Sequence, residues 1–234
     1  MAEPGKRFEK YQDYISSQIK RAEKEGRPAK PNPAITISRE TGAGAIPLGD
    51  RLAEYLNERF GSAECQWTVF DKNLVKQVLE DHGLPERLEQ FMQEDKPSLL
   101  DETVSDMLGI RPPDWELVKH THETIYRLAK LGNCILVGRG ANIITQELPN
   151  VLHLRLVGSW EKRVNRCMEL YGITKAEARE LIKKQDRARR RYMLAYYDTD
   201  IDDPANYHLI INVDRFTTEA LVQLIGDMIS NWSK

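Results

Sequence analysis

The sequence has little cysteine and no long apolar run. Its three cysteines, Cys65, Cys134 and Cys167, are far apart and odd in number, which argues against a disulfide framework and a cysteine-based metal site. No apolar stretch approaches the length of a membrane-spanning helix. The first residues are polar and charged, so we expect no secretory signal. Together these features predict a reduced, cytoplasmic protein.

Net charge is also nearly absent. The chain of 234 residues has 34 basic and 36 acidic side chains, a formal net charge of -2. This balance argues against wholesale coating of nucleic acid but not against one anionic ligand. The five histidines show no metal-ligand spacing, and no nucleophile elbow or metalloprotease helix is present. We therefore predict no metal-ligating residues.

Apolar strand patterns and helical patterns alternate along residues 34–234. Most of the strand patterns are continuous apolar runs, which favours parallel strands covered on both faces and a three-layer α/β domain. The predicted strands are residues 34–38, 67–70, 134–137, 151–157 and 207–212. The predicted helices are residues 47–60, 114–131, 159–171, 174–192 and 217–232.

Two further segments complete the predicted organisation. Residues 1–33 combine a helix that has one apolar stripe with a proline-rich linker. This helix is expected to cover the domain or to contact a partner, and a homo-oligomer through residues 1–30 stays open. Residues 71–110 have a loose helical pattern and predict a helical insertion near the site.

A glycine-rich segment follows the first predicted strand. Gly42 and Gly44 can adopt backbone angles closed to other residues, and they let a phosphate approach the backbone. Pro47 suits the first turn of the next helix, whose positive end points at the loop. Strand, glycine loop and helix in this order predict a phosphate-binding loop, with a purely structural turn as the alternative.

A second cluster of candidate residues lies in the predicted helix 174–192. Thr174 and Glu177 form a capping-box signature at its start, and residues 183–191 are strongly basic. Arginine forks match phosphate oxygens in bidentate geometry, so this helix is a candidate mobile lid over a phosphate group. The acidic residues in 198–203 make nucleic-acid binding through this helix the weaker alternative.

Charged residues follow three of the predicted strands. Arg39, Asp71 and Arg139 each come directly after a strand, and Arg139 lies between two glycines. Ligands of open α/β sheets bind beyond the carboxyl ends of the strands. We therefore expect these three side chains to face one crevice.

Taken together, these elements resemble the cytidylate kinase-like family, a branch of the P-loop nucleoside monophosphate kinases, over residues 34–232. The resemblance rests on short motifs in a fixed order: residues 35–40 leading into 42–44, then 70–72, 137–140, 152–156, Arg163, the lid motif 186–189, and 203–207 with 211–212.

The resemblance implies a three-layer α/β/α P-loop kinase-like fold with a five-stranded parallel sheet. It divides the domain of residues 34–234 into a core, a helical acceptor region (71–131) and a helical lid (174–203). It also implies ATP and Mg²⁺ as cofactors, and a nucleotide such as CMP, or another small phosphorylated or hydroxylated acceptor, as substrate. The implied phosphate-binding residues are Gly42, Ala43, Gly44, Ala45 and Gly49; the substrate-binding residues are Arg39, Asp71, Arg139 and Arg163; and the catalytic residues are Arg139, Arg187 and Arg189.

The chain departs from this family at the loop. Ala45 and Pro47 stand where authentic cytidylate kinases have lysine and a threonine or serine, which neutralise the phosphates and hold Mg²⁺. Losing one such contact costs on the order of 3 kcal/mol in the transition state. Arg39, Lys72 or the lid could restore part of this charge. Two hypotheses therefore stay open: an ATP-dependent phosphotransferase, and a nucleotide-binding or partner-binding protein that has lost kinase activity.

Overall fold

The computed structural model describes residues 13–14, 16–18, 31–60, 66–71 and 115–232. Five parallel strands form one sheet, as predicted, and their order is β2-β3-β1-β4-β5. The strands are β1 (Ala34–Arg39), β2 (Thr68–Phe70), β3 (Cys134–Val137), β4 (Val151–Val157) and β5 (Leu209–Asn212). β1 is central because Ile35 pairs with Ile135 of β3 on one side and with Leu152 of β4 on the other.

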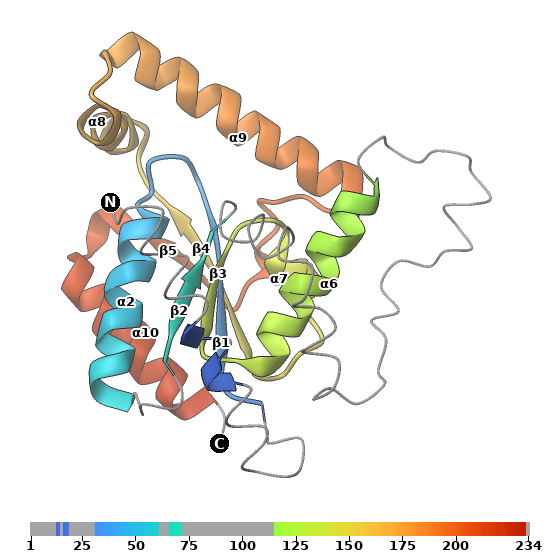
Figure 1. Cartoon of the computed structure of the whole chain (residues 1–234). Helices are drawn as coiled ribbons and strands as arrows, with labels where there is room; N and C mark the ends of the chain where they lie inside the picture. The colour runs from blue at the N-terminus through green and yellow to red at the C-terminus, as the bar shows by residue number, and fades with distance from the viewer. Residues whose placement is uncertain (1–12, 15, 19–30, 61–65, 72–114, 233–234) are drawn as a thin grey trace.

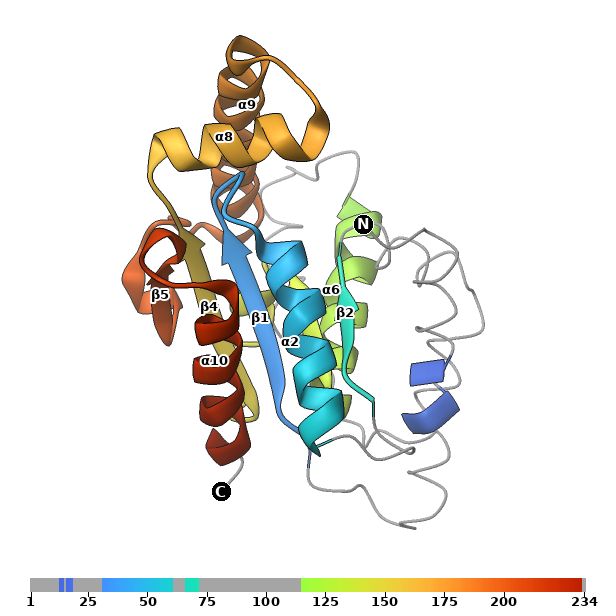
Figure 2. The same ribbon diagram turned by 90° about the vertical axis from the view of Figure 1, so that its left-hand side faces the viewer.

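Helices cover both faces of this sheet. The helices are α2 (Ala45–Phe60), α6 (Trp115–Leu131), α7 (Ala141–Ile144), α8 (Trp160–Tyr171), α9 (Lys175–Tyr197) and α10 (Thr218–Trp232), with short 3-10 turns at Pro204–Asn206 and Val213–Arg215. α2 and α10 lie on one face, and α6 and α7 on the other (Figures 1 and 2). The three-layer α/β fold that the sequence predicts is therefore confirmed.

Two apolar cores fill the space between the layers. Alternate residues of a strand point to opposite faces, so β1 sends Ile35 and Ile37 toward Leu52 of α2 and Ile225 of α10. The opposite core contains Leu136 of β3 and Leu128 of α6. Burial on both faces explains why β1 to β4 are mostly apolar, whereas the edge strand β5 is half-exposed.

The N-terminal segment reaches the second core through Tyr14. Its ring packs edge-on against Phe70 with 5.3 Å between ring centroids, and its hydroxyl donates to the carbonyl of Gly132 at 2.7 Å. Residues 13–14 and 16–18 are helical. The apolar stripe predicted for this helix, and the predicted insertion from residue 72 onward, lie outside the described residues.

α8 and α9 lie beyond the carboxyl ends of the strands and cross above the sheet (Figure 1). The capping box predicted at Thr174 is present, with both reciprocal hydrogen bonds to Glu177. α9 continues five residues beyond the predicted end at residue 192. Of the helices in the described part of the chain, none combines the length and apolar character that a bilayer crossing requires.

Candidate active site

The loop between β1 and α2 is short and tightly turned. Gly42 and Gly44 have φ of 82° and 78°, in the left-handed region that glycine adopts readily. A Cβ at Gly42 would lie 2.5 Å from the backbone oxygen of Arg163, whereas one at Gly44 would meet nothing within 4 Å. Gly42 is therefore held against α8, and Gly44 faces open space.

α2 begins directly after this loop, with the Leu48 amide donating to the carbonyl of Gly44 at 3.0 Å. The first amides of a helix have no acceptor within it, so Ala45 and Ile46 present N–H groups at the positive end of α2. Pro47 has no N–H to offer. Ala45 is buried in the apolar core, and neither position supplies a cation.

Gly49 lies one turn inside α2 rather than in the loop. A Cβ there would meet the Val69 side chain of β2 at 3.4 Å, at the near limit of ordinary van der Waals contact. Its lack of a side chain therefore lets α2 approach the sheet closely.

The three predicted strand-end residues occupy neighbouring positions. The Arg39 guanidinium lies on the backbone of Gly138, where any Cβ would overlap Nη1. Burial lowers the pKa of Arg39 to about 10, helped by the like charges of Arg189 and Arg139 and opposed by Asp71 and Asp186. The crevice expected at the carboxyl ends of β1, β2 and β3 thus gathers three arginines, Arg39 included, and two aspartates.

The turn after β3 is built from three consecutive left-handed residues. Gly138, Arg139 and Gly140 have φ of 84°, 58° and 71°. Tyr197 of α9 packs on Gly140, where a Cβ would lie 2.4 Å from its ring. The Tyr197 hydroxyl also donates to the carbonyl of Arg139 at 3.3 Å. The end of α9 therefore covers the turn that displays the exposed Arg139 side chain.

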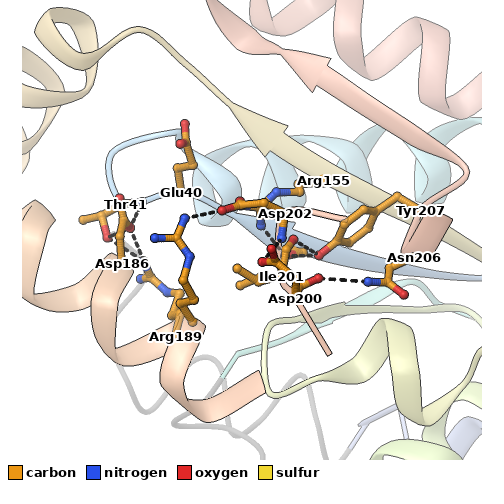
Figure 3. Close-up of polar contacts among 12 residues, drawn as sticks. Glu40, Thr41, Arg155, Asp186, Arg189, Asp200, Ile201, Asp202, Asn206 and Tyr207 are labelled. Carbon is orange, nitrogen blue, oxygen red and sulfur yellow. Dashed lines mark hydrogen bonds and ion pairs between the residues drawn. The ribbon is translucent and has the colours of Figure 1, made fainter. Parts of the chain in front are cut away.

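The middle of α9 is fastened to the loop through Asp186. This carboxylate accepts from the Thr41 amide at 2.8 Å and the Thr41 hydroxyl at 2.7 Å. Arg189 donates to the same oxygen as Thr41 at 3.0 Å (Figure 3). Arg163 of α8 donates to the other oxygen at 2.7 Å. Arg163 and Arg189 are thus brought to the glycine loop, as the lid hypothesis requires.

Arg187 differs from Arg189 in its surroundings. Its side chain is exposed, and within the described ranges it makes no ion pair. Arg189 is half-buried, and burial lowers its pKa while Asp186 opposes that shift. Of the two predicted lid arginines, only Arg189 faces the loop.

A second carboxylate fastens the chain that follows α9. Asp202 pairs with Arg155 of β4 and with Arg190 of α9, and Arg155 also donates to the Ser38 hydroxyl at 3.0 Å (Figure 3). Tyr207 donates to the carbonyl of Ile201 at 2.7 Å in the same cluster.

Sequence reasoning did not single out Thr41, Asp186, Arg155 or Asp202 as site residues. Two signals were available. Arg155 is a charged residue within an apolar strand, which requires a buried partner. Asp186 lies three residues before Arg189, so both project from one side of α9.

A metal ion could be held here only if a bound nucleotide supplied most of its ligands. Within the ranges that the structure describes, no three His, Cys, Asp or Glu side chains lie close enough to bind a metal together. Mg²⁺ bound with a nucleotide takes most of its ligands from phosphates and water and one or two from protein carboxylates. Asp71, the carboxylate beyond β2, lies near enough to Arg39 to act on its pKa.

Comparison with known proteins identifies a family, two relatives and one similar structure. The model of the cytidylate kinase-like family matches residues 34–215. The chain is 24% identical over 201 residues to the cytidylate kinase of Staphylothermus marinus, covering 86% of this chain and 98% of that protein. It is 30% identical over 91 residues to the uronate isomerase of Corynebacterium glutamicum, but this match spans 39% of this chain and only 18% of that enzyme.

A solved structure of an uncharacterized protein from Eubacterium ventriosum superposes with a TM-score of 0.65. The two chains are 21% identical, and the match covers 86% of this chain and 99% of that one. At this identity the likeness concerns the fold, which extends through almost the whole of the other protein.

Proposed function

The chain belongs to the cytidylate kinase-like family, and from this premise we propose that it is an ATP-dependent, Mg²⁺-assisted phosphotransferase. Its acceptor in this proposal is a nucleotide such as CMP or another small phosphorylated or hydroxylated molecule. The observation that carries the proposal is the gathering of Arg39, Arg139 and Arg189, with Asp71 and Asp186 among them, where Arg189 also contacts Thr41 of the glycine loop. Like charges in a partly buried site raise each other's free energy, and an anion relieves that repulsion.

The proposed reaction is an in-line transfer of a phosphoryl group, without a covalent enzyme intermediate. Such a transfer needs little covalent chemistry from the protein, so catalysis rests on positioning and on neutralising negative charge. In this proposal the amides of Ala45 and Ile46 hold the donor phosphates, and Arg39 and Arg139 hold the acceptor. Arg163 and Arg189 neutralise the group being transferred, in place of the absent loop lysine. Mg²⁺ supplies further charge neutralisation when it is bound with the nucleotide.

A second function is favoured by the loop itself. Ala45 is packed into the core and Pro47 lacks an N–H group, so the start of α2 offers fewer contacts to phosphate than a loop ending in lysine and serine. A nucleotide-binding or partner-binding protein without turnover is therefore the alternative.

Calorimetric titration with ATP, CMP and Mg²⁺, followed by a turnover assay over a panel of acceptors, separates the two functions. For a phosphotransferase, we expect Arg139→Ala and Arg189→Ala each to lower kcat/KM by about a hundredfold, the loss typical of a transition-state charge contact. Lys184→Ala is the matched control, because it removes an exposed cation from α9, the helix that carries Arg189.

Thermal melting of each variant would check that the fold is intact. Normal turnover in both arginine variants would refute their assigned roles. Nucleotide binding without turnover on any acceptor would favour the alternative.

A further inference from the structure

Three elements meet around the carboxylate of Asp186. The donors are the amide and hydroxyl of Thr41 in the β1–α2 loop, Arg163 of α8 and Arg189 of α9 itself. We infer that these groups, the Asp186 socket, form a site for a phosphate-type oxyanion that the chain's own carboxylate occupies in this structure. A ligand phosphate must then displace Asp186 in order to bind.

The donor set of the socket has the chemistry of an anion site. A loop amide, a hydroxyl and two guanidinium groups all donate, and none of them needs a carboxylate in particular. Their distances to the Asp186 oxygens lie between 2.7 and 3.0 Å. Figure 3 shows Thr41 and Arg189 converging on this carboxylate from the loop and from α9. A phosphate offers the same donors more oxygens and more charge than a carboxylate does.

One buried donor of the socket is left unsatisfied. Arg163 is only 7% exposed, yet its Nε has no hydrogen-bond acceptor. The Glu40 carboxylate lies 3.4 Å from Nε, which contributes attraction between charges but not a well-directed hydrogen bond. Buried donors are rarely left unpaired in folded proteins. The carboxylates of Asp186 and Glu40 therefore satisfy the socket incompletely.

The local charges explain why Asp186 competes with a ligand. With Asp186 in place, the carboxylates of Asp186 and Glu40 balance Arg163 and Arg189. When Asp186 leaves, the arginines outnumber the remaining acid, and Arg39 lies close enough to feel both Asp186 and Arg189. Removing the Asp186 charge should therefore strengthen the binding of any other anion at this place.

The location of Asp186 on α9 couples this exchange to the lid. Displacing the carboxylate breaks the two hydrogen bonds that Asp186 accepts from Thr41. The contacts of Gln185 and Arg189 with the Thr41 hydroxyl, and that of Arg190 with Asp202, do not involve Asp186. The Asp186 carboxylate thus helps to hold α9 on the loop until a phosphate displaces it from the socket. The inference rests on the proposed function only in treating the loop as a phosphate site.

Calorimetric titration of the full chain with inorganic pyrophosphate, without Mg²⁺ and at fixed ionic strength, tests the inference. We expect Asp186→Asn to bind pyrophosphate about tenfold more tightly than the parent chain, because the competing charge is gone. The matched control is Asp198→Asn, which removes the same charge from an exposed position at the end of the same helix. Its affinity should stay within twofold of the parent.

Each other outcome overturns the inference. Equal or weaker binding by Asp186→Asn would mean that Asp186 positions the arginines for the ligand. Absence of pyrophosphate binding in all three proteins would mean that no oxyanion enters the socket. If Asp186→Asn does not fold, judged by thermal melting, Asp186→Ser is titrated instead with the same expectation.

Turnover, assayed separately over the acceptor panel, keeps the two proposals distinguishable. Tighter pyrophosphate binding by Asp186→Asn, with no turnover by the parent chain, would support the socket and contradict the phosphotransferase proposal. Turnover by the parent chain, without tighter pyrophosphate binding by Asp186→Asn, would support the phosphotransferase proposal and contradict the socket.

Discussion

The turn after β3 shows how single residues set the geometry of the candidate site. Arg139 adopts a left-handed conformation with φ of 58° between two glycines that do the same, which costs a non-glycine residue about 1 kcal/mol or more. The hydroxyl of Tyr197 on its carbonyl helps to hold it there. Strain of this kind persists only where surrounding contacts maintain it, and it is concentrated at functional sites.

Gly42 allows a direct test at the same scale. Gly42→Ala is expected to destabilise the protein by about 3 kcal/mol, since the left-handed conformation is strained and the new Cβ must displace the backbone of Arg163. Gly44→Ala is the matched control, because φ is almost the same and the space is open. It should cost about 1 kcal/mol. Urea unfolding measures both, and equal losses would contradict the close contact with α8.

At the scale of elements, α8 and α9 pack on each other more than on the sheet. A small apolar cluster of Val164, Cys167, Ala178 and Ile182 joins the two helices, separate from both sheet cores. Their links to the loop are polar, through Asp186, Arg163 and Arg166. Polar links can be exchanged for a ligand at less cost than a buried apolar interface, which suits a lid.

The start of α9 depends on its capping box. We expect Thr174→Ala to lower the free energy of unfolding by about 1 kcal/mol, because the hydroxyl of Thr174 accepts from the amide of Glu177. Thr174→Ser keeps that hydroxyl and should retain most of the stability. Urea unfolding followed by circular dichroism compares the two variants. Identical losses in both would show that the methyl group, not the cap, is responsible.

At the scale of the whole molecule, a stacked pair of histidines joins several elements around the sheet. The rings of His153 and His208 lie 4.8 Å apart, centroid to centroid, and Trp232 of α10 packs edge-on against His208. Nδ1 of His153 is 2.8 Å from the Thr36 hydroxyl. β1, β4, the start of β5 and α10 therefore meet at these rings.

This arrangement predicts acid-sensitive stability. Burial, and then the nearby His208, lower the pKa of His153 to about 4 from an ordinary value of 6.5. Below pH 6.5 the unfolded chain binds a proton that the folded chain refuses, so stability is complete above pH 6.5 and falls as the pH drops toward 4. The loss from His153 amounts to about 3 kcal/mol at pH 4.

Urea unfolding between pH 4 and 7 checks this expectation. His153→Gln should flatten the pH dependence, whereas His120→Gln, at an exposed position on α6, should leave it unchanged. Part of the slope should survive in His153→Gln, because burial also lowers the pKa of His122 and of His208. An unaltered slope in His153→Gln would contradict the role of this pair.

The predictions from sequence succeeded where the signal is local. Each predicted strand is present, because an apolar run can be recognised without knowing its neighbours; all but the half-exposed edge strand β5 are buried on both faces. The start of α9 was predictable because a capping box involves residues only three apart. Arg39, Asp71 and Arg139 could be assigned to one edge because parallel strands end on the same side of a sheet.

The sequence by itself thus determined the layers, the parallel sheet and the glycine loop that meets the start of a helix. Tertiary structure alone decided how the site is assembled. Thr41 and Asp186 are 145 residues apart, and Arg155 and Asp202 are 47 apart, so neither pair leaves a periodic or neighbouring signal. Within the sequence Asp186 is one acid in a run of bases; only the folded chain brings its carboxylate against the loop amide, where it occupies the place suited to a phosphate.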